Sequence, residues 1–241
     1  MSTRLKDYIL FEDEQLVAIN KPAGLLTVPD REGKDISLKK MLQDAYGSIF
    51  TVHRLDRETS GLVVFAKNEN SHRELSQLFE KRETTKIYCG LVLGKPAEPS
   101  GLIEAAIIEH PVKKGVMTVA KKGKESSTSY ELLESFRLYS WMQFRIYTGR
   151  THQIRVHMKH IGHPIVADPV YGDGKPVFIS ALKKKYNLAK AEEEERPILA
   201  RLALHAARLQ FVLDGKPYDF EAELPKDLRA VLQQLRKNTK G

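Results

Sequence analysis

The segment Leu209–Ala222, LQFVLDGKPYDFEA, carries a strong fold signal. Apolar and polar residues alternate on both sides of Asp214-Gly215, a dipeptide that is typical of a tight turn between antiparallel strands. The segment therefore predicts a β-hairpin in which each strand buries one face.

Similar patterns recur along the rest of the chain. Apolar or alternating runs predict strands at residues 15–20, 61–66, 86–93 and 142–147. Apolar residues three and four apart predict helices at 38–45, closed by Gly47; at 71–79, opened by a Ser71–Glu74 capping box; and at 225–235, opened by Pro225. Several neighbouring strands are joined too tightly for parallel crossovers, so we expect an α+β fold with a mixed, mostly antiparallel sheet and helices packed on it.

The composition indicates a globular protein with its own core. The 241 residues are 41% hydrophobic and 29% charged, and no apolar run approaches the roughly 18 residues of a membrane span. A single cysteine, Cys89, excludes an internal disulfide framework and a cysteine-cluster zinc site. We expect one domain over residues 1–241, with a charged insertion at 176–197, and a cytoplasmic protein with no membrane segment.

The charge balance favours an anionic partner. Lysine and arginine total 39 against 31 acids, a net charge of +8, which suits a polyanion such as nucleic acid. Between residues 113 and 124 the chain has no acid and five lysines, namely Lys113, Lys114, Lys121, Lys122 and Lys124. Taken alone, such a run is also explained by a solvated loop, which is the simpler interpretation.

One candidate for chemistry is His53–Leu62, HRLDRETSGL. Asp56 lies between Arg54 and Arg57, and a nearby cation favours the ionised carboxylate. Such a carboxylate is a candidate nucleophile. The alternative is a turn aspartate held by a surface ion pair.

Two further segments carry candidate residues. In GRTHQIRVHM (149–158), Thr151 is placed to cap a helix that Gly162 would end. Arg155 lies beside the apolar stripe of this helix, and a buried arginine needs an anionic partner. In KIY (86–88), Tyr88 lies on the strand face opposite the apolar one, where it could stack on a base or be a half-buried sheet residue.

Other catalytic classes lack their motifs. HRLD differs from the kinase order His-Arg-Asp, and the chain contains no GxxxxGK[ST], GxGxxG, GxSxG or HExxH. His152, His157, His160 and His163 lack the spacing of a zinc-protease motif and have cationic neighbours. No metal site is expected.

The HRLDRETSGL segment resembles the catalytic motif of the RluA-type RNA pseudouridine synthases. Four other stretches resemble signatures of that family, in family order between about Ile9 and Leu224: ILFEDEQLVAINKPAGLLTVP, KIYCGLVLG, GRTHQIRVHMKHIGHPIVADPVYG and LALHAARL. The resemblance implies the pseudouridine synthase fold, a mixed sheet crossed by an RNA-binding cleft. It also implies isomerisation of uridine in ribosomal or transfer RNA without a cofactor.

The resemblance also implies roles for individual residues. Asp56 matches the essential carboxylate, Arg155 its ion-pair partner, and Tyr88 the tyrosine that stacks on the target uracil. Arg54 matches an arginine that enters the RNA stack, and Ile154 would support the base. Apart from the resemblance, the charge of the lysine run predicts that RNA phosphates are bound by Lys113, Lys114, Lys121 and Lys122.

Longer relatives carry an N-terminal S4-type domain. Here the catalytic signature begins near residue 9, so we expect no such domain, and we expect a monomer. Two alternatives remain open: a non-catalytic RNA-binding or folding factor on the same fold, and a hydrolase that releases uracil.

Overall fold

The computed structural model describes residues 5–30, 33, 35–183 and 194–239, and the chain divides into two units. Unit 1 comprises Met1–Tyr88, Arg145–Thr148 and His205–Glu223, and unit 2 comprises Cys89–Phe144, Gly149–Leu204 and Leu224–Gly241. The helices are η1 (Leu5–Tyr8), α1 (Leu38–Tyr46), α2 (Glu69–Glu80), α3 (Gln153–His160), α4 (Ile179–Leu182) and α5 (Lys226–Thr239).

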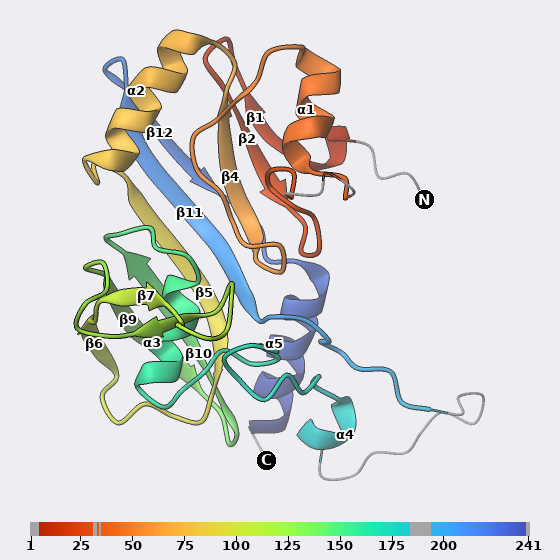
Figure 1. The fold of residues 1–241 in the computed structure, drawn as a ribbon. Coiled ribbons are helices and arrows are strands. Elements are labelled where there is room, and N and C mark those ends of the chain that lie inside the picture. The colour runs from red at the N-terminus through yellow and green to blue at the C-terminus, as the bar shows by residue number, and fades with distance from the viewer. Residues whose placement is uncertain (1–4, 31–32, 34, 184–193, 240–241) are drawn as a thin grey trace. The chain divides into compact units, whose positions relative to one another are not determined.

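The strands confirm the predicted mixed sheet. They are β1 (Ile9–Glu12), β2 (Leu16–Lys21), β3 (Phe50–Thr51), β4 (Ser60–Ala66), β5 (Thr85–Leu93), β6 (Ser100–Glu104), β7 (Ile107–Glu109), β8 (Met117–Val119), β9 (Ser127–Ser135), β10 (Tyr139–Ile146), β11 (Leu204–Leu213) and β12 (Lys216–Glu221). The large sheet has the order β1-β2-β4-β11-β5-β10-β9-β6, with β12 on β11 and β3 on β4 (Figure 1). The pairs β1–β2, β2–β4, β6–β9 and β11–β12 are antiparallel, whereas β11 pairs with β4 in parallel.

Strand β4 is the centre of unit 1. All seven of its residues are buried, as expected for a strand covered on both faces. Its parallel pairing with β11 joins Ser60 to His205 and Gly61 to Ala206. His205 is fully buried, and its Nε2 lies 3.0 Å from the carbonyl oxygen of Ala222, so Nε2 carries the proton. Its Nδ1 then accepts a hydrogen bond from the Ser60 hydroxyl at 3.0 Å.

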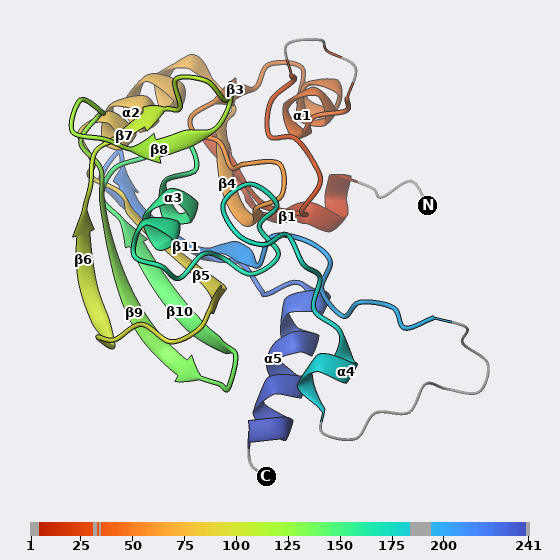
Figure 2. The same cartoon turned by 60° about the horizontal axis from the view of Figure 1, so that its bottom comes forward.

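Unit 2 places a hairpin and a helix against each other. Strands β7 and β8 form a separate two-stranded sheet that contacts α3 (Figure 2). Ile107, Val156 and Tyr171 form a buried cluster at this contact. Helix α5 buries the apolar face predicted from the sequence, namely Leu228, Val231, Leu232 and Leu235.

Local predictions succeeded except at two helix starts. The 209–222 hairpin, α1 with Gly47 after its end, and α5 after Pro225 are confirmed. Helix α2 begins earlier than predicted because the Asn68 side chain, rather than that of Ser71, is the cap; its Oδ1 accepts a hydrogen bond from the Ser71 N–H at 2.9 Å.

The predicted Thr151 cap of α3 is wrong. His152 holds the cap position with a left-handed φ of 56°, and the Gln153 side chain accepts a hydrogen bond from the Arg150 N–H instead.

Two further predictions concern the charged insertion and the lack of a membrane-spanning segment. Of the charged insertion at 176–197, the structure describes α4 and its flanks, and residues 184–193 lie outside the described residues. Among the described helices, none is long and apolar enough to cross a membrane.

Replacing Gly61 with alanine should strongly destabilise the protein. Gly61 has a φ of 109°, and a Cβ here would overlap the backbone oxygen of Ala206 and lie 2.7 Å from its nitrogen. We expect Gly61→Ala to lower the free energy of unfolding by about 3 kcal/mol, measured by urea unfolding. Gly215→Ala is the control: φ is 71° there but no atom lies within 4 Å, so a loss of about 1 kcal/mol is expected. Equal losses would contradict a steric role for Gly61.

Candidate functional site

The loop that carries Asp56 is anchored at its start by His53. The Nε2 of His53 accepts a hydrogen bond from the Val64 N–H of β4 at 3.1 Å, and its ring stacks on Phe79 of α2 at 4.5 Å. Burial, together with the ammonium of Lys86, lowers the pKa of His53 to about 3. His53 is therefore a neutral anchor at pH 7 and not an acid or base.

The second attachment is at Leu55. The Thr27 hydroxyl donates to the Leu55 carbonyl at 2.9 Å and accepts a hydrogen bond from the Leu55 N–H at 3.1 Å. Both residues are buried, so one hydroxyl satisfies both backbone groups of Leu55. These two hydrogen bonds fix the backbone directly before Asp56.

The third attachment is at Arg57 and depends on the buried Lys21. The Lys21 ammonium, fully buried, donates to the carbonyl oxygens of Pro22 at 3.0 Å, Leu25 at 2.8 Å and Arg57 at 3.0 Å. The Gly24 N–H also donates to the Arg57 carbonyl at 2.9 Å. The backbone after Asp56 is thereby tied to the 21–27 segment.

These attachments leave Arg54 and Asp56 between the anchored residues. Arg54 is exposed and Asp56 is half-buried. Burial raises the pKa of the Tyr88 hydroxyl, and the Asp56 carboxylate raises it further, so these two side chains interact and Tyr88 stays protonated at neutral pH. In unit 1, Asp56 and Tyr88 therefore lie within electrostatic range of each other.

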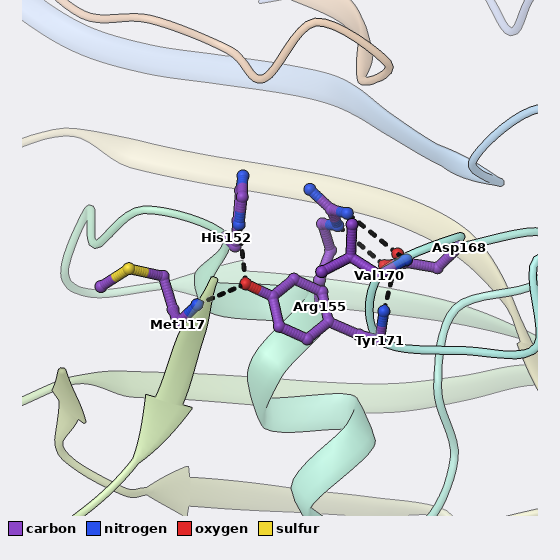
Figure 3. A network of polar contacts seen from close by, with 6 residues as sticks. All are labelled: Met117, His152, Arg155, Asp168, Val170 and Tyr171. Carbon is purple, nitrogen blue, oxygen red and sulfur yellow. Dashed lines mark hydrogen bonds and ion pairs between the residues drawn. The ribbon is translucent and has the colours of Figure 1, made fainter. Parts of the chain in front are cut away.

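In unit 2, Arg155 forms a buried two-bond ion pair with Asp168. Its Nε donates to Asp168 Oδ2 at 2.7 Å and its Nη2 to Oδ1 at 2.9 Å (Figure 3). The side chains are 7% and 0% exposed. Burial favours the protonated acid, but the hydrogen bonds and charge of Arg155 outweigh it, so the pKa of Asp168 lies below its ordinary value. The buried Arg155 was predicted to need an anionic partner, and Asp168 is one such partner.

Tyr171 packs against this pair. The Arg155 guanidinium lies 4.9 Å from the centre of the Tyr171 ring. The Tyr171 hydroxyl accepts a hydrogen bond from the Met117 N–H at 2.8 Å and lies 2.7 Å from His152 Nδ1, as Figure 3 shows. Tyr171 therefore connects the hairpin, the start of α3 and the ion pair.

The predicted RNA-contacting residues of unit 2 occupy two kinds of environment. Ile154 is buried at 5% exposure. The four lysines are exposed, two between β7 and β8 and two after β8: Lys113, Lys114, Lys121 and Lys122.

Two cavities adjoin this hairpin. One of about 580 Å³ is lined by Lys113, Lys159, His110 and His160 and by apolar residues that include Met117. Another of about 460 Å³ is lined in part by Lys122, Lys124 and Arg150. Basic groups thus gather around the hairpin.

Sequence reasoning assigned no role to Lys21, Asp168 or Tyr171, although all three lie within the motifs quoted above. A lysine at the end of an apolar strand and an acid directly after Ile165-Val166-Ala167 both predict a buried charge that needs a partner. Within the described ranges, no group of three or more metal-ligating side chains is found.

Replacing Lys21 with methionine should loosen the Asp56 loop. Methionine keeps the length but removes the ammonium donor from three carbonyls, of which that of Arg57 keeps the Gly24 N–H, and it also removes a buried charge. The net loss expected in the free energy of unfolding is about 2 kcal/mol, measured by urea unfolding. The exposed Lys40, which pairs with Asp44 one turn along α1, is the control, and Lys40→Met should change stability by less than about 1 kcal/mol. Unchanged stability of Lys21→Met would show that the ammonium does not hold the loop.

The comparisons with known proteins agree on one family. A family model described as RNA pseudouridylate synthase matches residues 15–160. The ribosomal large subunit pseudouridine synthase D of Buchnera aphidicola subsp. Schizaphis graminum is 35% identical over 236 residues, which cover 95% of this chain and 73% of that protein. Its namesake from Escherichia coli (strain K12) is 35% identical over 244 residues, covering 95% and 70%.

Solved structures show the same fold. The human RNA pseudouridylate synthase domain containing 4 superposes with a TM-score of 0.75 at 25% identity, covering 96% of this chain and 94% of the human one. The human domain containing 1 gives 0.70 at 25% identity, covering 95% and 94%. The chain therefore belongs to the RluA-type family of RNA pseudouridine synthases, isomerases that convert uridine in RNA to pseudouridine.

Proposed function

We propose that the substrate is a uridine of large-subunit ribosomal RNA and that Asp56 is the catalytic carboxylate. The names of the relatives support the substrate. The observation that supports the residue is the loop itself: attachments at His53, Leu55 and Arg57 hold Asp56 in place beside Tyr88. A catalytic group needs such fixed placement, because small misplacements cost large factors in rate.

The chemistry requires a detached base to be held and turned. The N1–C1′ bond breaks, the uracil rotates, and a C5–C1′ bond forms; C5 loses a proton and N1 gains one. No atoms are added and nothing is oxidised, so a carboxylate is sufficient without a cofactor. The Asp56 carboxylate acts either at C1′ as a nucleophile or by removing a sugar proton, and both routes require it to be ionised.

Arg155 and Tyr88 have supporting roles in this proposal. Arg155 pairs with the Asp56 carboxylate, and its planar fork aims a carboxylate better than a lysine does. Tyr88 stacks on the uracil, and its raised pKa makes the hydroxyl a hydrogen-bond donor rather than a standing base.

Arg54 and Ile154 complete the handling of the target nucleotide. The exposed Arg54 fills the gap that the extruded uridine leaves in the RNA stack, and Ile154 gives apolar support to the base. Extrusion costs a few kcal/mol, which stacking and gap filling offset.

We also propose that the enzyme works in the cytoplasm as a monomer without a bound metal. Ten large apolar side chains of the described residues are exposed, and they are spread along the chain between Leu10 and Val212 rather than grouped in one run. The lack of a continuous exposed apolar run among the described residues supports a monomer.

Asp56→Asn should abolish turnover while it preserves the fold and RNA affinity. The amide has nearly the same shape but is neither a nucleophile nor a base. Rejoining through C5 expels the C5 hydrogen, so tritium release from [5-³H]uridine-labelled ribosomal RNA reports the reaction directly. We expect release below about a hundredth of wild type.

Three other results of this assay would be informative. Residual activity above that level would remove Asp56 from the chemistry. Free uracil among the products would indicate hydrolysis. Tight RNA binding by wild type without release would indicate a binding factor.

Neutralising Lys113, Lys114, Lys121 and Lys122 should weaken RNA binding and make it less salt-dependent. Each lost phosphate contact to single-stranded RNA removes about 0.7 from the slope of log K against log salt, so a quadruple glutamine variant should lose about 3. Filter binding at several salt concentrations measures the slope.

A matched control neutralises four exposed lysines outside the 107–124 segment. Lys40, Lys81, Lys95 and Lys237 are exposed and serve this purpose. The proposal expects a clearly smaller change for the control, and equal slopes in the two variants would mean that the hairpin lysines have no specific part in binding.

A further inference from the structure

Asp168 occupies only one side of the Arg155 guanidinium. A guanidinium has five N–H donors in a rigid fork, and Asp168 takes the Nε donor and one Nη2 donor. The opposite edge, formed by Nη1 and the outer Nη2 hydrogen, is the edge through which Arg155 can bind a second carboxylate in the same two-bond geometry.

The Asp168 carboxylate is itself fixed by its own loop. Its Oδ1 also accepts hydrogen bonds from the N–H groups of Val170 at 2.9 Å and Tyr171 at 3.0 Å. Asp168 is fully buried, and the preceding Ala167 has a left-handed φ of 56°. Surrounding contacts must hold a backbone that contains such a residue, so the carboxylate has one orientation.

Tyr171 supports the face of the guanidinium. Its ring packs against Arg155, and its hydroxyl is held by the Met117 N–H and His152 Nδ1. Figure 3 shows Arg155 between the Tyr171 ring and Asp168, and we expect these contacts to favour one side-chain conformation of Arg155.

We propose that Asp168 is a positioning residue for the isomerisation: it orients Arg155 so that the guanidinium edge beyond the one bound to Asp168 is aimed at the catalytic carboxylate. The inference rests on the proposed function, in which Arg155 pairs with Asp56. An arginine side chain has several rotatable bonds, and a fixed carboxylate on its Nε edge removes that freedom before substrate binds. Asp168 also balances a buried charge that would otherwise be costly to desolvate.

The direct test is Asp168→Asn in the tritium-release assay. We expect kcat per folded enzyme to fall about 100-fold while KM changes by less than about threefold, because the arginine is misaimed rather than lost. The decisive measurement is a double-mutant cycle with Arg155→Lys. If Asp168 acts through Arg155, Asp168→Asn should cause little further loss of kcat in the Arg155→Lys background.

The chain offers a matched control in Arg201 and Asp227. Arg201 donates from Nε to Asp227 Oδ2 at 2.7 Å and from Nη2 to Oδ1 at 2.8 Å, the same pairing in the same unit. Asp227→Asn should lower stability but leave kcat per folded enzyme normal. The proposal is overturned if Asp168→Asn behaves like this control, or if its effect multiplies with that of Arg155→Lys.

A second measurement does not depend on the folding of Asp168→Asn. The Nε–H of Arg155 can be observed by nitrogen-15 NMR in Asp56→Asn protein without RNA, with Arg155→Lys identifying the signal. We expect an order parameter near the value of about 0.85 found for rigid backbone. A mobile side chain would contradict the proposal. Absence of tritium release by wild type would instead count against the proposed function, and this NMR result would still stand by itself.

Discussion

The Lys21 ammonium lies fully buried among three backbone carbonyls, and the loop that carries Asp56 depends on this arrangement. Removing an ammonium from water costs several kcal/mol unless acceptors replace the lost hydration. The carbonyls can surround the ammonium only if the 21–27 and 53–57 segments lie against each other. The need to compensate the buried Lys21 charge therefore fixes the position of the backbone at Arg57, and with it that of the neighbouring Asp56.

A comparable solution is used for Arg155 in the other unit. There a buried carboxylate, that of Asp168, pairs with the buried guanidinium. The same carboxylate also accepts hydrogen bonds from two backbone N–H groups. In both cases a charge that must be compensated determines the geometry of a chain segment. Asp56 itself is only half-buried, so the carboxylate proposed to react is accessible to substrate. Lys21, Thr27 and Leu55, which hold its loop, are buried.

Sequence reasoning succeeded where the signal was local. The Asp214-Gly215 turn and the apolar face of α5 are determined by neighbouring residues, and Asp56 and Tyr88, which the motifs singled out, lie near enough for the carboxylate to raise the pKa of the Tyr88 hydroxyl. It failed where two capping side chains compete, as at Asn68 and Ser71. It could not supply the parallel pairing of β4 with β11 or the choice of Asp168 for Arg155, because these depend on contacts between separated segments. The functional roles of all the site residues, namely Asp56, Tyr88, Arg155, Arg54, Ile154 and the four lysines, remain predictions.

The path of the chain has a consequence for how the protein is made. Strand β4 receives β11 as its neighbour only after residues 205 and 206, so about 140 residues are synthesised between the two partners. At roughly 5–20 residues per second, the interval is on the order of ten seconds. During that time the Ser60–Gly61 end of β4 lacks its β11 partner in the nascent chain, whereas β3 and the His53 side chain can already occupy the same strand edge at Val64–Ala66. The sheet of unit 1 can therefore be completed only after residue 206 has been synthesised, although most of β4 can pair with β2 and β3 long before.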